Sequence, residues 1–397
     1  MSVRKKAAVI GLGHQALEDH VPGLADSQFA QLAAVCDTDP GKAAAQAQRH
    51  SVPGFTDIRS LLKDVRPDFA IVAVPHHAGR EVIEACAAAG VHVIKEKPFA
   101  TSPAEAAELV AMCGTAGIEL MVTVQRRFHP VYTAAVQLLE QIGQPYLVEG
   151  RYTFHSPDPA AGWSGRARLA GGGALMDMGD HLIDLLIWYL GLPDRILADT
   201  STAAHPDADY DAEDTALVHI AYDSGMYGSL LISRSAGPKT GQLMMTGPRG
   251  AVVIERGRVR RLAPDGQLIE SLTGEPAWPF AAAAQIDCFC RVLDGERTNP
   301  SGPPPTWHTP RSWPPPTPPR SPARPPTRRS TCDRRRASRP PGRPAPHRHP
   351  RPALLLAPDR EQRRPGRHRP ADVRGVHPGP LRRHRRAGGH PGVLPRR

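Results

Sequence analysis

Five mainly apolar runs within the first 125 residues restrict the fold of this chain more than any other feature. Each run is four to six residues long, and helical patterns of apolar residues separate most of them. Strands that are apolar at every position are typical of parallel sheets, which helices cover on both faces. We therefore predict a doubly wound α/β domain over residues 1–125. The runs are Ala7–Ile10, Gln31–Cys36, Phe69–Val74, Val91–Ile94 and Glu119–Val124.

The pattern changes after residue 125, where strand-like stretches follow one another without helices between them. Thr215–Tyr222 and Met226–Ser233 flank Asp223-Ser224-Gly225, a turn signal that predicts a β-hairpin. Helical patterns cover Ala174–Tyr189 and Phe280–Leu293. A run of strands without crossovers indicates antiparallel pairing. We expect residues 126–300 to form an α+β domain with a mainly antiparallel, open sheet that carries the substrate and oligomer contacts.

The formal charge of +11 is unevenly distributed along the chain. Residues 300–397 contain 24 Arg, no Lys and four acidic residues, which leaves a net charge of −9 for the first 299 residues. A mildly acidic globular part is usual for a cytoplasmic enzyme. About 300 residues are enough to bury two separate cores.

The last 98 residues have a composition of their own, with 26 of the chain's 44 prolines and no Ile, Met, Phe, Tyr, Lys or Asn. Those six residue types use A/T-rich codons, so their absence is expected where GC-rich DNA is translated out of frame. With GC-rich codons, a two-base shift converts Pro304–Arg320 into an amphipathic helix sequence. We predict that residues 301–397 form a disordered Pro/Arg-rich tail that is out of frame. A genuine nucleic-acid-binding tail is the alternative, but only Trp307 and Trp313 are available for base stacking.

Cysteine usage and hydropathy exclude several classes of protein. The six cysteines are scattered without a disulfide framework, and Cys288-Phe289-Cys290 lies in a helical pattern that does not suit zinc. His76 and His77 lack acidic partners at metal-binding spacing, so we predict no metal site. No apolar run reaches 18 residues, which argues against a signal peptide or a membrane span. We expect a cytoplasmic protein without membrane or nucleic-acid partners.

A glycine turn follows the first apolar run. Gly11-Leu12-Gly13-His14-Gln15-Ala16 matches G-x-G-x-x-[G/A] between a strand and a helix. Such glycines let the backbone approach a pyrophosphate, which the N–H groups of the helix start attract. Asp37 ends the second run, where a carboxylate can bind both hydroxyls of an adenosine ribose. Asp37-Thr38-Asp39 would repel a 2′-phosphate, so NAD is favoured over NADP. The alternative role for Asp37 is a helix cap before Pro40.

Lys97 in Glu96-Lys97-Pro98 follows the apolar run Val91–Ile94. In open α/β sheets ligands bind beyond the carboxyl ends of strands, so the ammonium can hydrogen-bond a substrate oxygen there. Pro98 fixes the turn, and a cis bond would aim the lysine. An ordinary surface lysine beside Glu96 is the alternative.

Asp177 and His181 stand four residues apart, just after Gly171-Gly172-Gly173. In an α-helix they share one face. A histidine accepts a hydroxyl proton near neutral pH, and a nearby carboxylate stabilises the imidazolium. A helix-surface ion pair is the alternative, but the glycines indicate close backbone approach at the helix start. His155 and Trp163 are further candidates for the substrate cleft.

In combination, these motifs resemble the Gfo/Idh/MocA family of glucose–fructose oxidoreductase and inositol dehydrogenase, over about residues 5–300. The segments that carry the resemblance are the glycine turn, Val72-Ala73-Val74-Pro75, Glu96-Lys97-Pro98-Phe99-Ala100, Val124-Gln125-Arg126-Arg127-Phe128-His129-Pro130, and Gly171 through Asp177, His181 and Asp184. Gln125 departs from the asparagine often found there, and His76-His77-Ala78-Gly79 departs from the family's Asn-x-x-His.

The resemblance implies a Rossmann domain, an α+β domain whose open sheet forms homo-oligomers when the C-terminus is intact, and NAD as the cofactor. It implies three catalytic residues, Lys97, Asp177 and His181, with His181 exchanging the proton. The predicted cofactor contacts are Gly11, Leu12, Gly13, His14, Gln15, Asp37, Pro75, His76, Glu96, Lys97 and Gln125. The predicted substrate contacts are Lys97, Arg127, His155, Trp163, Asp177 and His181.

These residues predict an NAD-dependent oxidoreductase that transfers hydride between a secondary hydroxyl of a sugar, cyclitol or aminocyclitol and the nicotinamide. A non-catalytic dinucleotide-binding sensor on the same scaffold is the alternative. The intact lysine, aspartate and histidine favour the enzyme, because a sensor has no need of them.

Overall fold

The computed structural model describes residues 3–274 and 278–302, and most of the predicted tail, from residue 303 on, lies outside them. The first sheet has six parallel strands in the order β3-β2-β1-β4-β5-β6. Its strands are β1 Lys5–Ile10, β2 Ala30–Cys36, β3 Gly54–Phe55, β4 Phe69–Val72, β5 His92–Lys95 and β6 Leu120–Val122. The predicted doubly wound domain is therefore confirmed, and all five apolar runs match strand positions to within two residues at each end.

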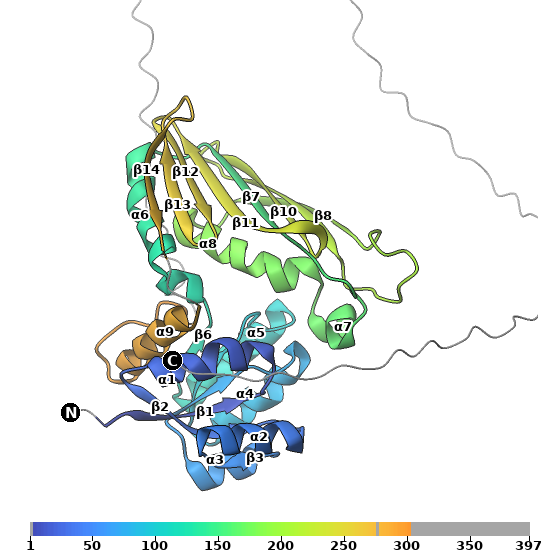
Figure 1. Cartoon of the computed structure of the whole chain (residues 1–397), viewed down its shortest axis with the longest axis vertical. Coiled ribbons are helices and arrows are strands. Elements are labelled where there is room, and N and C mark those ends of the chain that lie inside the picture. The colour runs from blue at the N-terminus through green and yellow to red at the C-terminus, as the bar shows by residue number, and fades with distance from the viewer. Residues whose placement is uncertain (1–2, 275–277, 303–397) are drawn as a thin grey trace, which may run out of the picture. The chain divides into compact units, whose positions relative to one another are not determined.

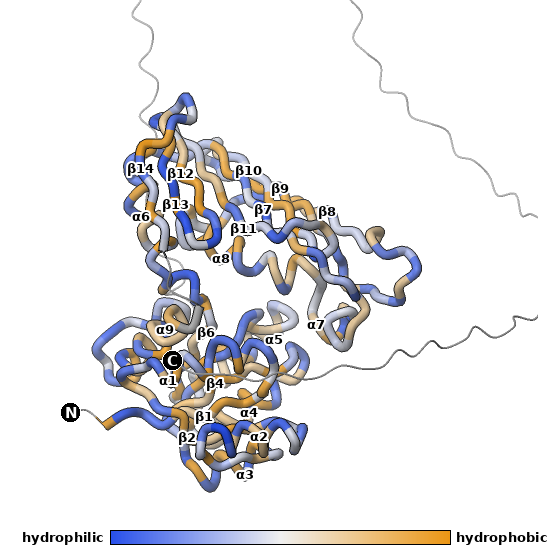
Figure 2. The backbone as a smooth tube through the Cα atoms, viewed as in Figure 1, coloured by the Kyte–Doolittle hydropathy of each residue, from blue (hydrophilic) through white to orange (hydrophobic). Residues whose placement is uncertain are grey.

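Helices connect these strands and cover the sheet (Figure 1). They are α1 Val21–Asp26, α2 Pro40–His50, α3 Ile58–Val65, α4 Gly79–Ala88 and α5 Pro103–Ala116. All four residues of β4 are buried, as expected for a strand with helices on both faces. Parts of this sheet, around the labels β1, β2 and β4, are strongly hydrophobic in Figure 2.

Side-chain caps fix where the helices begin. Asp39 caps α2, its Oδ1 accepting hydrogen bonds from Gly41 N at 2.8 Å and Lys42 N at 3.2 Å. Ser102 caps α5 in the same manner, just before Pro103. The cap before Pro40 is thus Asp39, so the capping role considered for Asp37 is wrong.

The second sheet has eight strands in the order β14-β13-β12-β11-β7-β10-β9-β8. Its pairs are antiparallel except for β10 and β7, which run parallel. The predicted hairpin is present as β9 paired with β10. The strands are β7 Leu147–His155, β8 Arg195–Ser201, β9 Thr215–Ala221, β10 Tyr227–Ser233, β11 Ser235–Gly247, β12 Gly250–Glu255, β13 Arg258–Leu262 and β14 Leu268–Thr273.

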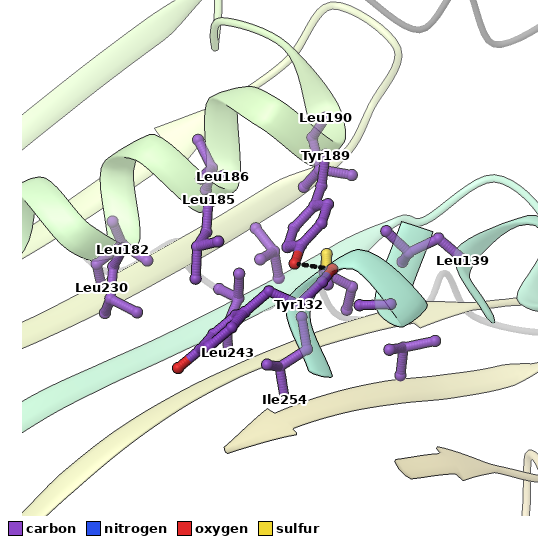
Figure 3. Packing of buried hydrophobic residues seen from close by; sticks show 14 of the residues in the cluster. Tyr132, Leu139, Leu182, Leu185, Leu186, Tyr189, Leu190, Leu230, Leu243 and Ile254 are labelled. Atoms are coloured by element: carbon purple, nitrogen blue, oxygen red, sulfur yellow. Dashed lines mark hydrogen bonds between the residues drawn. The ribbon is translucent and has the colours of Figure 1, made fainter. Parts of the chain in front are cut away.

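Two helices, α6 Pro130–Ile142 and α8 Asp180–Leu190, pack against this second sheet. Leu182, Leu185 and Leu186 of α8 are at most 2% exposed and point toward the strands in Figure 3. Each such leucine contributes about 1.5–3 kcal/mol when it is removed from water. The Tyr189 hydroxyl donates to the Tyr132 carbonyl at 2.8 Å and joins the two helices (Figure 3).

The helix α9 Trp278–Leu293 returns to the first sheet's side of the chain and packs beside α1 (Figure 1). Phe289 is fully buried, and its ring meets the Phe69 ring edge-on at 5.5 Å. Asn299 and Ser301 then run along β6, with the Ser301 hydroxyl donating to the Val122 carbonyl at 2.8 Å. The α/β core therefore uses residues from both ends of the described chain.

No helix in the described ranges has the length and apolar character needed to cross a membrane. The predicted cytoplasmic location stays a prediction.

Candidate active site

The glycine turn lies where β1 ends and meets the end of β4. Gly11 has φ +87°, and a Cβ there would stand 2.5 Å from the Ala73 carbonyl oxygen. Gly13 faces open space, with nothing within 4 Å of its ideal Cβ position. The Leu12 N–H donates to Asp37 Oδ2 at 2.8 Å, which ties the turn to the carboxylate that ends β2. Gly11 therefore lets the turn pack closely against the end of β4, and Gly13 leaves its backbone open to a dinucleotide.

A cavity of about 830 Å³ extends from this turn along the carboxyl ends of the strands. Most predicted cofactor residues line it, including Asp37, but the Leu12 side chain is buried beneath the turn and Gln125 lies elsewhere. Lys42 also lines the cavity, a cation that the sequence analysis did not select. The predicted residues that line it are Gly11, Gly13, His14, Gln15, Asp37, Pro75, His76, Glu96 and Lys97.

Lys97 stands just beyond β5, and its peptide bond to Pro98 is cis, as anticipated. Its Nζ donates to Asp177 Oδ1 at 2.8 Å and to the Asp177 carbonyl at 2.9 Å. Burial lowers the pKa of Lys97, but Asp177 and Glu96 outweigh it and the pKa lies above its ordinary value. Burial likewise raises the pKa of Asp177, yet Lys97 outweighs it and the pKa falls. The pair is thus an ammonium and a carboxylate at neutral pH.

Glu96 and Lys95 have roles that the sequence did not reveal. The Glu96 carboxylate lies within hydrogen-bond distance of His20 Nε2, at 2.7 Å, and both side chains are buried. Lys95 is 1% exposed, and its Nζ donates to the Glu96 carbonyl at 2.6 Å. Burial lowers the pKa of Lys95 to about 8. Its stem passes Gly79, where a Cβ would lie 2.8 Å from Lys95 Cε. Together these contacts hold the segment that carries Lys97.

A second cavity of about 310 Å³ adjoins the first, since Lys97, Glu96, His14 and Gln15 line both. Burial, followed by Arg126 and Lys97, lowers the pKa of His181 well below its ordinary value. The imidazole is therefore neutral at physiological pH. Burial also raises the pKa of Asp180 to about 7, and Asp184 and Glu96 add to the rise. Other residues that line this cavity are Glu18, Asp19, Thr123, Val124, Gln125, Arg126, Tyr152, Asp184, Lys239 and Arg256.

The segment that carries Asp177 and His181 is not a single α-helix. Leu175–Gly179 form a π-helical turn, and α8 begins only at Asp180. Asp177 faces the larger cavity and His181 the smaller one, and in residues 3–274 and 278–302 no hydrogen bond joins them. The four-residue spacing therefore does not produce the shared face that an α-helix would give, because the wider π turn offsets the two side chains.

The three glycines before this segment do allow a close approach, as predicted. A Cβ on Gly173 would lie 1.9 Å from the Glu213 carbonyl oxygen. The Glu213 carboxylate accepts hydrogen bonds from Gly173 N at 2.6 Å and Leu175 N at 2.9 Å. Gly171, at φ +83°, lies against Thr101 of the first domain. The glycines thus place Asp177 next to Lys97.

The remaining predicted substrate residues are dispersed. Trp163 lines the larger cavity and packs on His76, with ring centroids 4.4 Å apart. His155 stacks on His205 at 6.3 Å and lines neither cavity. Arg127 also lines neither, because it pairs with Asp184 at 2.5 Å. Its neighbour Arg126, which was not selected from the sequence, lines the smaller cavity instead.

Several features fit a dinucleotide in the larger cavity: the open backbone at Gly13, the carboxylate at Asp37, and the helix start that follows the turn. Gln125 Nε2 is buried without a hydrogen-bond partner at the neighbouring cavity. Across the part of the chain that the structure describes, no three His, Cys, Asp or Glu side chains are grouped to hold a metal ion.

The fold and the site together define a two-domain, dinucleotide-binding oxidoreductase class. Residues 5–124 match the profile described as "Oxidoreductase family, NAD-binding Rossmann fold", and residues 132–260 match "GFO/IDH/MocA C-terminal domain". The chain belongs to the Gfo/Idh/MocA family of oxidoreductases.

Three related proteins show the range of the similarity. The chain is 28% identical over 226 residues to D-xylose 1-dehydrogenase (NADP(+)) 2 of Haloferax volcanii, covering 54% of this chain and 69% of that protein. It is 31% identical over 228 residues to D-apiose dehydrogenase of Paraburkholderia graminis, covering 56% of this chain and 59% of the relative. The structure of aldose-aldose oxidoreductase from Caulobacter crescentus, complexed with glycerol, shares the fold with a TM-score of 0.69 and 24% identity, over 76% and 92% of the two chains.

Proposed function

We propose that this protein is an NAD-dependent dehydrogenase that oxidises a secondary hydroxyl of a sugar, cyclitol or aminocyclitol to a ketone. The observation that carries the proposal is that Lys97 and His181, from different domains, line one cavity that opens onto the dinucleotide crevice through Lys97 itself. The related dehydrogenases of xylose and apiose support a sugar substrate. A bound nicotinamide would accept the hydride of the substrate carbon.

The protonation states of His181 and Lys97 suit them to different roles in the reaction. Burial keeps His181 neutral, so its imidazole accepts the hydroxyl proton as the C–H hydride leaves. Lys97 stays an ammonium because Asp177 and Glu96 outweigh the effect of burial, and it donates to the same oxygen as negative charge develops there. Asp177 positions Lys97 through the 2.8 Å contact rather than orienting His181.

Predicted cofactor contacts fall on the larger cavity. The Asp37 carboxylate is proposed to bind the two hydroxyls of the adenosine ribose, which favours NAD over NADP. Gly13 has no side chain and nothing near its Cβ position, so the pyrophosphate can approach the backbone there, whereas the Gly11 N–H already donates to the Cys36 carbonyl at 2.8 Å. Gln125, the remaining predicted cofactor contact, lines the smaller cavity instead.

Substitution of Lys97 tests the catalytic assignment. In a Lys97→Met enzyme we expect kcat with NAD and a sugar or polyol panel to fall at least about 100-fold, because general-acid and electrostatic groups typically contribute factors of that size. NAD affinity should change much less, since the turn and Asp37 remain. Lys63→Met, at an exposed lysine of α3, is the matched control. Normal turnover in Lys97→Met would reject the assignment, and NAD binding without turnover on the whole panel would favour the sensor.

Large apolar side chains are exposed on the second sheet, which supports a homo-oligomer through this sheet. We propose a second copy of the chain as its partner, and light scattering of a Leu217→Asp variant tests this. A smaller mass than the unmodified protein supports it, and an unchanged mass rejects it. The exposed residues are Tyr146, Leu147, Ile196, Leu197, Leu217, Tyr227, Leu268, Ile269 and Leu272.

A further inference from the structure

Arg126 is a buried cation without a counter-charge. It lies in the short 3₁₀ turn Gln125–Phe128, is 6% exposed, and lines the smaller cavity. Its Cζ stands 5.5 Å from the Tyr132 ring and 5.1 Å from the Tyr152 ring. Among the described residues, no carboxylate pairs with its guanidinium and no hydrogen bond from its side chain is formed. Aromatic faces recover only part of what burial of a charge costs.

The neighbouring arginine shows what a satisfied guanidinium looks like in the same fold. Arg127 makes three contacts to the Asp184 carboxylate, at 2.5 to 3.1 Å, and donates to the Pro300 carbonyl at 3.1 Å. It lines neither cavity. The two adjacent arginines thus have different surroundings. The donors of Arg127 are used in a structural ion pair, whereas the guanidinium of Arg126, with its five N–H donors, lines the cavity.

The acidic residues of the smaller cavity do not supply the missing charge. Glu96 is held by His20, and Asp184 by Arg127. Asp19 accepts a hydrogen bond from Gln15. Glu18 is exposed to water. Asp180 forms no hydrogen bond or ion pair with the Arg126 guanidinium in the described part of the chain, and burial disfavours its charged form.

Further cations stand at the same cavity. Lys239, in β11, and Arg256, just after β12, are both exposed and both line it. Lys97 is already paired with Asp177. The cavity is therefore lined by one buried guanidinium that forms no ion pair or hydrogen bond with the described residues, and by two exposed cations. Arg126 does not line the larger cavity, where the dinucleotide is proposed to bind.

We propose that Arg126 and Lys239 bind a carboxylate of the substrate, so that the hydroxyl oxidised at Lys97 and His181 belongs to a sugar acid. A planar guanidinium binds a carboxylate through two parallel hydrogen bonds, which fixes both the position and the orientation of the ring that carries it. The proposal rests on the dehydrogenase function proposed above and adds the charge of the substrate to it. Arg126 is then the residue that selects acids over neutral sugars.

Matched substrate pairs test this selection with the full chain and NAD. We compare kcat/KM for glucuronate with glucose and for galacturonate with galactose, and include glucose 6-phosphate and glucosamine. We expect the acid to exceed its neutral parent at least tenfold. In Arg126→Met that ratio should fall at least tenfold, mainly through KM, and Arg126→Lys should restore part of it. Lys239→Met should lower it less, and Lys63→Met should leave it unchanged.

Three outcomes would overturn the proposal. The first is an equal kcat/KM for a neutral sugar and its acid. The second is an Arg126→Met enzyme in which kcat/KM falls equally for both substrates, since the guanidinium would then bind hydroxyls. A preference for glucose 6-phosphate over glucuronate would exclude the carboxylate. If no compound is turned over, the dehydrogenase proposal fails separately. Calorimetric binding of glucuronate to the NAD complex then decides: weaker binding by Arg126→Met supports the anion site, and equal binding rejects it. Unchanged thermal midpoints and NAD affinity confirm that each variant is folded.

Discussion

Asp180 gives the sharpest test of the electrostatics at the smaller cavity. Burial, with Asp184 and Glu96 nearby, raises its pKa to about 7 from an ordinary value of 3.8. A carboxyl whose folded pKa is raised contributes its full stability below pH 3.8 and loses it as the pH rises toward 7. Each unit of pKa difference is worth about 1.4 kcal/mol, which gives about 4 kcal/mol in total. Because Asp180 is only half-buried, screening by water reduces this to about 2 kcal/mol or more.

Asp180→Asn removes the titration while keeping the shape of the side chain. We expect the variant and the unmodified protein to have similar free energies of unfolding at pH 4. The variant should become progressively more stable than the unmodified protein up to pH 7, with a slope of at most about 1.4 kcal/mol per pH unit and a plateau above it. Urea denaturation at pH 4, 5, 6, 7 and 8.5, followed by circular dichroism, measures the difference.

The matched control is Asp209→Asn, at an exposed carboxylate paired with Arg166. The hydrogen bond from Arg166 lowers the pKa of Asp209, so this variant should show the opposite sign, with its small loss of stability confined to the higher pH values. A difference between Asp180→Asn and the unmodified protein that does not vary with pH would refute the reasoning. So would a variant that becomes the less stable protein above pH 7.

Three further predictions follow from individual contacts. Gly173→Ala should lower both the thermal midpoint and kcat, because its Cβ would lie 1.9 Å from the Glu213 carbonyl oxygen, whereas Gly114→Ala, with nothing within 4 Å, should be neutral or stabilising in the same melts. Phe289→Ala should cost about 3–5 kcal/mol in urea denaturation, since the ring is fully buried; a cost below about 1 kcal/mol would contradict the packing of α9. Asp37→Ser should weaken NAD binding more than NADP binding in calorimetry, and a parallel loss of both would reject the proposed ribose contact.

The sequence predicted those parts of the fold whose pattern reflects burial. Strands such as β4 are buried at every position, and apolar runs in the sequence predicted them. The edge strands β8 and β14 were missed, because all their residues are exposed and no alternation marks them. The last helix was predicted, but its apolar residues reveal only that it is buried. Its packing beside α1 depends on tertiary contacts that no local pattern encodes.

For the site, the sequence predicted which residue types take part but not how their side chains are arranged. Lys97, Asp177 and His181 were selected as residue types suited to the reaction, and the structure places all three at two adjoining cavities. The four-residue spacing of Asp177 and His181 did not predict that Asp177 pairs with Lys97. Arg127 was chosen over Arg126 for a similar reason, since neighbouring side chains in a turn point in different directions that the sequence does not record.

The π turn at Leu175–Gly179 explains why Asp177 pairs with Lys97 and not with His181. If this segment were α-helical, Asp177 would stand over His181, and a carboxylate there would raise the pKa of the imidazole. In the structure Asp177 pairs with Lys97 instead, and the pKa of His181 is lowered by burial and then by Arg126, Lys97 and Arg256. In the proposed mechanism, one ammonium donor and one neutral acceptor would then face the same substrate oxygen. The irregular turn therefore supports the proposed chemistry more directly than the regular helix expected from the sequence.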